Sequence, residues 1–381
     1  MKTINKSDIL SLIDHTSQPC LSLYMPAHRS SAQSEGDAKL MKNLIYVAQE
    51  KLKSSGVPPA VSDNIIKKIE NATLKDADLW IEGADGIAVF ASPDYFHVFQ
   101  LPRKFPERAE VDVQFVITPL VPLLISEIEF HVLALSINQV SLYHCTPYSI
   151  EEIDLPNAPK NLKEFLQFDE TQKQMQYRTI TASSGSKIMH GHGPGKEDEK
   201  EQLKQYCMKI DNALTQFMNS HKTPLVVAST DTLWGVFHDV SKNSPYNPKS
   251  ILGNYEHINA KEIKDNAWKK IESDVKQQNE RQFATYQELE GTGKTQNDIR
   301  QILPSACDGR INVLFAEVDK GIYGRYKHEN QEVSISENRQ DDDEDLLNLA
   351  VSMVLQKSGN VIPIEGHPVF NGASLAAILR Y

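Results

Sequence analysis

The spacing of apolar residues changes several times along this chain, and that alternation constrains the fold more than any single motif does. Four apolar residues from Leu40 to Leu52 recur every four positions, which predicts a helix with one buried face. Residues 86–93 then form a short apolar run that ends in a turn, and residues 96–101 alternate in polarity. This second pattern predicts a β-hairpin.

The alternation continues to the C-terminus. Three strands at hairpin spacing are predicted within 130–155, followed by a helix over 198–218, a buried strand at 224–228 and a long helix over 260–289. The last ninety residues predict helices at 297–306 and 346–357 and strands at 311–318, 361–365 and 375–379. Strands interleaved with helices indicate a mixed α/β (α+β) protein.

Two lapses in the apolar pattern predict domain boundaries. Pro119 and Pro122 mark a junction near residue 125, because proline cannot donate to a sheet ladder. Residues 291–295 look like the end of a phosphate-binding loop, but Glu288 stands where that motif needs its first glycine, so a linker is predicted. For 381 residues we therefore expect three domains, at 1–125, 126–290 and 291–381.

Charge and composition exclude several classes of protein. The net charge is −11 and each expected domain holds more acidic than basic residues, so any contact with nucleic acid must come from a local basic patch. Apolar runs are far shorter than the roughly 20 residues that span a bilayer, and residues 1–13 lack the pattern of a secretory signal. The four cysteines are widely separated. These features predict a cytoplasmic protein with reduced thiols, no membrane contact, no cofactor and no metal site.

Catalytic signatures are missing from the sequence. It contains no nucleophile elbow, no zinc-binding His-Glu-x-x-His and no cysteine in a nucleophile context. Cys207 falls on the apolar stripe of its helix and is predicted to lie in the core, and His131 and His144 are predicted to be packing or edge residues. Five acidic residues at 341–345 precede the last helix, where they complement the helix dipole. A solvated helix start is favoured there over a cation site.

The segment 183–196 is the most informative part of the sequence. It contains Gly185, Gly191, Gly193 and Gly195, and such loops either remain mobile or let the backbone approach a ligand closely. The residues alone leave both interpretations open. A metal site at the two histidines of this segment is the lesser alternative, because no third ligand is identifiable by spacing. We expect the loop to be exposed and more mobile than the body of its domain.

Several segments resemble the bacterial archaeo-eukaryotic release factor family. They are Leu-Ser-Leu-Tyr-Met-Pro-Ala-His-Arg at 21–29, Asp-Gly-Ile-Ala-Val-Phe at 85–90, His-Gly-His-Gly at 190–193, Pro-Leu-Val-Val-Ala at 224–228, Asp-Leu-Leu-Asn-Leu-Ala at 345–350 and Ala-Ala-Ile-Leu-Arg-Tyr at 376–381. Together they extend over nearly the whole chain. The resemblance implies an N-terminal α/β domain, an RNase H-like middle domain and a C-terminal α/β domain similar to ribosomal protein L7Ae.

The resemblance also implies a ribosome-facing loop. Release factors carry Gly-Gly-Gln in the middle domain just before a long helix, and that loop enters the peptidyl transferase centre. Residues 185–196 occupy the same place here but include no glutamine, so weak or absent hydrolysis of peptidyl-tRNA is expected, and no enzyme activity is assigned. The expected ribosome or RNA contacts are Lys187, His190, Gly191, His192, Gly193, Gly195 and Lys196.

Two functional hypotheses follow. The first is a translation factor that contacts the ribosome or tRNA and acts on stalled or hibernating ribosomes. The second is a non-enzymatic interaction module that keeps the release-factor fold and binds proteins through its acidic surface. A local basic strip formed by Arg178, Lys187, Lys196 and Lys204 would favour the first, and a uniformly negative surface would favour the second.

Overall fold

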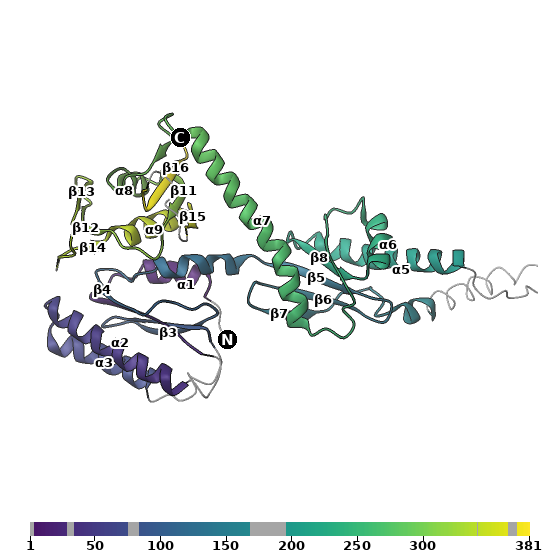
Figure 1. Ribbon diagram of the computed structural model, residues 1–381, viewed down its shortest axis with the longest axis horizontal. Helices are drawn as coiled ribbons and strands as arrows, with labels where there is room; N and C mark the ends of the chain where they lie inside the picture. Colours follow the sequence, from purple (N-terminus) through teal and green to yellow (C-terminus); the bar gives the residue numbers. More distant parts are fainter. Residues whose placement is uncertain (1–3, 29–33, 75–83, 168–195, 341, 365–371) are drawn as a thin grey trace, which may run out of the picture. The chain divides into compact units, whose positions relative to one another are not determined.

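The computed structural model describes residues 4–28, 34–74, 84–167, 196–340, 342–364 and 372–381 (Figure 1). The chain forms two compact units. Residues 1–127 and 278–381 make up the first, and residues 128–277 make up the second. The first unit is therefore built from the two ends of the chain, with the second unit inserted between them.

The N-terminal part of the first unit is an antiparallel sheet with two helices on one face. Its strands follow the order β3-β2-β1-β4. They are β1 (Cys20–Pro26), β2 (Gly86–Ala91), β3 (Phe96–Leu101) and β4 (Arg108–Asp112), and the helices of this part are α1 (Lys6–Ile13), α2 (Ser34–Ser54) and α3 (Pro59–Thr73), followed by the 3₁₀ segment η3 (Thr118–Glu127). The predicted hairpin of β2 and β3 is confirmed.

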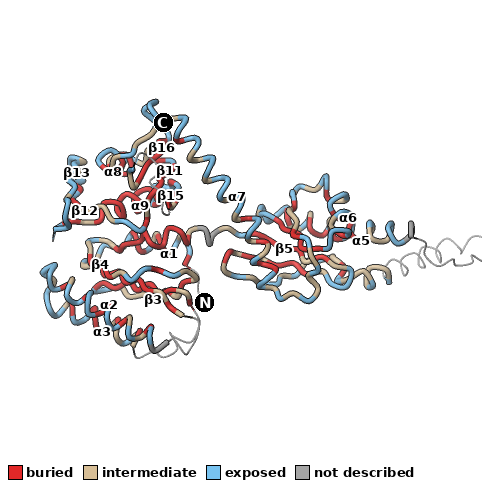
Figure 2. The backbone as a smooth tube through the Cα atoms, in the orientation of Figure 1, coloured by how far each residue is buried: buried red, intermediate tan, exposed pale blue. Residues whose placement is uncertain are grey.

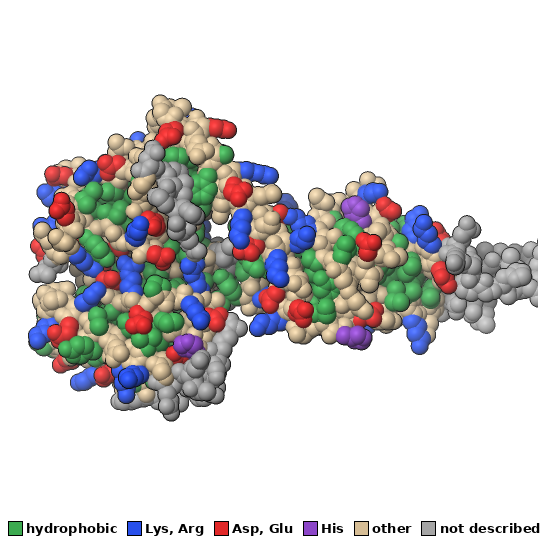
Figure 3. Space-filling view, in the orientation of Figure 1, with side chains coloured by type: hydrophobic (Ala, Val, Ile, Leu, Met, Phe, Trp, Pro, Cys, Tyr) green, Lys and Arg blue, Asp and Glu red, His purple; other side chains and the backbone are tan. Residues whose placement is uncertain are grey.

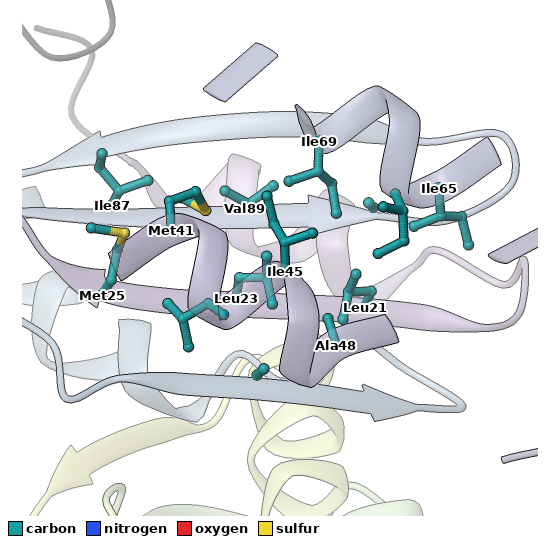
Figure 4. Packing of buried hydrophobic residues seen from close by; sticks show 14 of the residues in the cluster. Leu21, Leu23, Met25, Met41, Ile45, Ala48, Ile65, Ile69, Ile87 and Val89 are labelled. Atoms are coloured by element: carbon teal, nitrogen blue, oxygen red, sulfur yellow. The ribbon is translucent and has the colours of Figure 1, made fainter. Parts of the chain in front are cut away.

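One apolar core joins this sheet to its helices (Figure 4). Met41, Ile45 and Ala48 of α2 project onto Leu23 of β1 and Val89 of β2. The four-residue spacing read from the sequence thus places one face of α2 in the core.

A close backbone approach in this sheet requires glycine. A Cβ atom at Gly86 would lie 2.2 Å from the carbonyl oxygen of Arg103 and 2.6 Å from the ring of Phe105. Position 86 accepts no side chain without displacing backbone, which is why β2 begins with glycine.

The C-terminal part of the first unit contains two further sheets. One has the order β10-β16-β11-β15 and the other the order β13-β12-β14. The elements are β10 (Thr295–Gln296), α8 (Ile299–Cys307), β11 (Ile311–Ala316), β12 (Tyr323–Lys327), β13 (Glu332–Ile335), β14 (Glu344–Asp345), α9 (Leu346–Gln356), β15 (Asn360–Pro363) and β16 (Leu375–Leu379). Helix α9 is buried along nearly all of its length (Figure 2).

The N-terminus of α9 holds the two parts of the first unit together. Asp345 caps the helix by accepting from the amides of Leu347 and Asn348, both at 3.1 Å. The buried Asn348 amide group accepts from the amide of Ile117 at 2.7 Å and donates to the carbonyl of Phe115 at 3.0 Å. Backbone groups next to η3 therefore depend on a side chain from the far end of the sequence.

The acidic run before α9 is not a solvated helix start. Asp345 does cap the helix, but Asp343 and Asp345 are only 5 % and 3 % exposed. Arg108 of β4 lies 3.4 Å from the Asp345 carboxylate, and Arg325 lies 3.6 Å from that of Asp343. The expectation of solvation was wrong for these two residues, because folding covers the run with other elements that supply cations.

The second unit is a five-stranded sheet with helices on both faces. The strand order is β7-β6-β5-β8-β9, with β5, β8 and β9 parallel to one another and β6 and β7 antiparallel. The strands are β5 (Phe130–Leu135), β6 (Val140–Cys145), β7 (Ile150–Ile153), β8 (Leu225–Ser229) and β9 (Lys249–Leu252). Helices α5 (Lys196–Met218) and α6 (Asp231–Ser241) pack on one face, and α7 (Ala260–Leu289) packs on the other.

These observations confirm the mixed α/β fold class. The first boundary between the units, at 127/128, lies close to the expected junction near 125. The second lies at 277/278 inside α7, and Phe283 and Tyr286 at the end of that helix pack on Phe315 of the first unit. The division into three domains stays a prediction. Among the described helices, none has both the length and the apolarity needed to cross a bilayer.

Replacing Asn348 with Ala should destabilise the first unit by about 2–4 kcal/mol, because it leaves the buried backbone groups of Phe115 and Ile117 without their partner. Urea unfolding followed by circular dichroism measures the loss. Asn64→Ala, at an exposed position of α3 in the same unit, should change stability by less than about 0.5 kcal/mol. Equal effects of the two substitutions would contradict the bridging role of Asn348.

Candidate functional site

The glycine-rich loop predicted as the ribosome contact lies mostly outside the described residues. Lys187, His190, Gly191, His192, Gly193 and Gly195 fall in the gap at 168–195. Lys196 is the first residue of α5, and its side chain is likewise outside the description. The structure does describe the two segments that lead into and out of this loop.

The segment that enters the loop is fastened to the turn between β5 and β6. Residues 162–167 are helical. Asn161 accepts from the amide of Glu164, whose carboxylate in turn accepts from the amide of Lys160, both at 2.8 Å. The amide of Leu162 donates to the carbonyl of Ile137 at 2.9 Å. Reciprocal capping of this kind fixes the start of the helical turn, and the bond to Ile137 attaches it to the sheet.

The helix that leaves the loop is fastened to the same turn. The hydroxyl group of Tyr206 on α5 donates to the carbonyl of Ser136 at 2.9 Å. The Tyr206 ring is fully buried and lies 5.9 Å from the ring of Phe165, in the entering segment. Burial raises the pKa of the Tyr206 hydroxyl, so it remains a protonated hydrogen-bond donor.

Both sides of the loop therefore converge on residues 136–139, which we call the root of the loop. Lys196 precedes Tyr206 by ten residues, about 15 Å along a helix at 1.5 Å per residue. Glu199, Lys200 and Glu201 in the first turns are exposed, whereas Tyr206 and Cys207 are buried. Helix α5 thus continues past the part that the sheet covers, and the loop departs from its outer end.

The root lies at the carboxyl end of the parallel strands, the edge where α/β sheets commonly bind ligands. Asn138 donates to the Glu256 carboxylate at 3.0 Å, and Glu256 donates its amide to Asn254 at 3.2 Å. A small cavity of about 90 Å³ opens beside these residues and is lined in part by Ser136 and Tyr255. Its size accommodates water rather than a cofactor.

No catalytic constellation accompanies this edge in the described part of the chain. The described residues contain no group of three or more His, Cys, Asp and Glu side chains arranged to hold a metal ion. Cys207 is buried as predicted, and burial raises the pKa of its thiol to about 12. A thiol of that kind is not a nucleophile at neutral pH.

Three histidines gather at the opposite end of the same sheet. The ring of His131 lies 5.3 Å from that of His144 and 5.7 Å from that of His221. The Nδ1 atom of His131 lies 2.7 Å from the hydroxyl of Thr223. Burial, with the neighbouring His144 and His221, lowers the pKa of His131 to about 4. His131 is thus a neutral packing residue, as its strand pattern predicted.

The charges near the root are mixed in sign. Of the four residues of the expected basic strip, the side chain of Lys204 alone is described, and it is exposed. Exposed Glu199, Lys200 and Glu201 alternate in sign beside it. Figure 3 shows basic and acidic side chains interspersed on the visible face. The strip itself stays a prediction.

Sequence reasoning missed the anchors of the loop. The pattern of Asn161 followed by Glu164 is a readable capping signal. Tyr206 has no such signal, because its hydroxyl bonds a carbonyl 70 positions away in the sequence.

Comparison with known proteins places this geometry in a family. Residues 130–273 match the model of bacterial archaeo-eukaryotic release factor family 7, which spans nearly the whole second unit. A search of curated proteins gives no match. The chain is a distant release-factor relative.

Solved structures similar to this release-factor relative include an archaeal translation termination factor and Pelota from Archaeoglobus fulgidus. The termination factor is 13 % identical over 99 % of both chains, with a TM-score of 0.22. Pelota is 12 % identical over 77 % of this chain and 79 % of its own, with a TM-score of 0.33. A model of ribosome-bound archaeal Pelota with ABCE1 is 11 % identical over 75 % of this chain and 72 % of that one, with a TM-score of 0.38. The family match at 130–273 carries the assignment.

The release-factor relative should lose stability as the pH falls from about 6.5 to 4. The folded state holds His131 neutral, with a pKa of about 4, whereas the unfolded state takes up the proton near pH 6.5. The expected contribution is a loss of about 1–3 kcal/mol over this window. Fluorescence of Trp234 and Trp268 during urea unfolding reports on the second unit.

His131→Gln should flatten this dependence, because glutamine does not titrate. His257→Gln, at an exposed position of the same unit, should leave the slope as it is in the wild type. An unchanged slope in His131→Gln would show that the cluster does not cause the acid sensitivity.

Proposed function

We propose that this protein is a ribosome-associated translation factor of the release and rescue type that acts on stalled or hibernating ribosomes. The glycine-rich loop is the proposed contact with the large subunit or with tRNA. The observation that carries the proposal is the root of the loop, where both flanking segments are hydrogen-bonded to Ser136 and Ile137. It lies within the segment that matches the release factor family.

The root explains how a glycine-rich segment could act at a distance from its domain. A loop with four glycines has little conformational preference of its own, so its position must come from its ends. Tyr206 fixes α5 to the sheet, and the helix then carries the start of the loop about 15 Å further out. Such a support presents a narrow, backbone-rich tip, which suits an RNA-lined channel.

The proposed contacts divide by chemistry. Lys187 and Lys196 would neutralise phosphates, supplying local positive charge in a chain with a net charge of −11. His190 and His192 would stack on bases or bond their edges, and the glycines between and after them would let RNA approach the backbone.

Hydrolysis of peptidyl-tRNA is proposed to be weak or absent. The loop has no glutamine, and the described residues around its root supply no alternative nucleophile or metal site. The factor would then act by occupying the ribosome or recruiting another activity. In this proposal the N-terminal domain, the RNase H-like middle domain and the L7Ae-like C-terminal domain keep the release-factor arrangement.

The net charge of −11 favours a second candidate function, a protein-interaction module that keeps the fold without contacting RNA. An acidic surface repels phosphates and attracts basic protein partners. Salt dependence of ribosome association separates the two candidates.

Ribosome co-sedimentation at low and high salt should show association that weakens as salt increases. Replacing both Lys187 and Lys196 with Ala should weaken binding and reduce the slope of log K against log salt by about 2, close to one unit for each lost phosphate contact. Replacing Lys261 and Lys270, exposed on α7, should leave the slope unchanged. Salt-independent association, or none, would favour the protein-interaction module.

Peptide release from stalled ribosomes should be close to background with the wild-type protein, beside a factor containing Gly-Gly-Gln as positive control. His190→Ala and His192→Ala should leave that low rate unchanged, because no chemistry is assigned to either imidazole. Robust release that either substitution abolishes would overturn the non-hydrolytic proposal and make the loop an active site.

A further inference from the structure

A cluster of six charged side chains connects β4 to the C-terminal part of the first unit. Its acidic members are Glu110, Asp112 and Asp345, and its basic members are Lys51, Arg108 and Arg339. The three carboxylate side chains are each less than 10 % exposed. A buried cluster of this kind is maintained only while each charge keeps its partner.

Arg339 is the central member of the cluster. Its guanidinium group donates to Glu110 at 2.6 Å, to the carbonyl of Val111 at 2.8 Å and to Asp112 at 3.2 Å. It also lies 4.7 Å from the centre of the Tyr323 ring. A single side chain in the segment 336–340 therefore grips three consecutive residues of β4.

Asp112 receives less compensation than its neighbours. It accepts from the amides of Val113 and Asp345 and from Arg339, but Asp345 brings a second carboxylate close to it. Lys51, Arg108 and Arg339 all lower the pKa of Glu110, outweighing the effect of burial. For Asp112, burial prevails and raises the pKa to about 7.

We propose that Asp112 and Arg339 form a charge-controlled latch, which fastens segment 336–340 to β4 and loosens when Asp112 ionises. The pair borders an open groove of about 850 Å³, which gives water a path to the carboxyl group. In the closed state Asp112 is buried, whereas release of the segment exposes it to solvent. Opening therefore changes the environment of this carboxyl group more than that of Glu110.

The sign of the pH effect follows from proton binding. Between about pH 4 and pH 7 the closed state holds a proton on Asp112 that the open state releases, so the latch closes more tightly as the pH falls. As the pH rises through 7 that advantage is lost. From pH 6 to pH 8 the opening equilibrium constant should increase about tenfold.

The other charged groups facing Asp112 do not reverse this sign. On β1, Cys20 pairs directly opposite Asp112, and burial raises its thiol pKa to about 12, so it remains neutral. Burial also raises the pKa of Asp345, which opposes a second negative charge nearby. Lys51, Arg108, Arg339 and Glu110, with Tyr323, complete the surroundings.

Hydrogen–deuterium exchange of the full chain tests the latch. The amides of Ser336 and Gln340 are hydrogen-bonded, to the carbonyl of Tyr323 and to Asp343, and so report opening of the segment. Protection factors, corrected for the intrinsic effect of pH on exchange, should fall about tenfold in the wild type from pH 6 to pH 8. Equal protection at both pH values would overturn the proposal.

Three variants make the test specific. Asp112→Asn keeps the shape of the side chain without its titration, so protection should no longer depend on pH. Arg339→Gln should lower protection at both pH values, and Asp319→Asn, at an exposed position of the same unit, should behave like the wild type. Persistence of the tenfold fall in Asp112→Asn, or full protection in Arg339→Gln, would show that this pair is not the latch.

Discussion

The first unit depends on a polar junction between residues that are far apart in the sequence. Asn348 reaches the backbone at 115–118, and Asp345 lies against Arg108, across separations of more than 225 residues. Closing a chain over that length costs entropy, which only contacts formed at closure can offset. Apolar packing alone would tolerate many relative positions of the two parts. The amide of Asn348 accepts and donates in fixed directions, so it selects one of them.

A similar economy governs the second unit. The turn at 136–139 offers carbonyl groups that its own sheet does not use, and they accept from Tyr206 on one side of the glycine-rich loop and from Leu162 on the other. A loop that must be free of side chains cannot position itself. The requirement for precision is therefore transferred to its ends, where a buried aromatic ring and a capped helical turn can satisfy it.

The sequence predicted local structure well because local structure follows from apolar spacing. The stripe from Leu40 to Leu52, the hairpin at 86–101 and the helix through Cys207 all formed as expected. Strand order could not be read in the same way, because β5 pairs with β8, whose residues follow more than 90 positions later. Nor could the burial of Asp343 and Asp345, since a run of acids looks solvated until the elements that cover it are known. Tyr206 looked like one more apolar residue, although its hydroxyl fixes the root of the loop.

The insertion of the second unit between two halves of the first has a consequence for synthesis. When Asp112 leaves the ribosome, Asp345 is still 233 residues away from being made. At about 5–20 residues per second, β4 waits roughly 10–50 s for the residues that complete its charge cluster. During that interval Arg108, Glu110 and Asp112 stand in water on an incomplete sheet, where their charges cost nothing to hydrate. The same polar residues that specify the finished junction thus keep an unfinished one soluble.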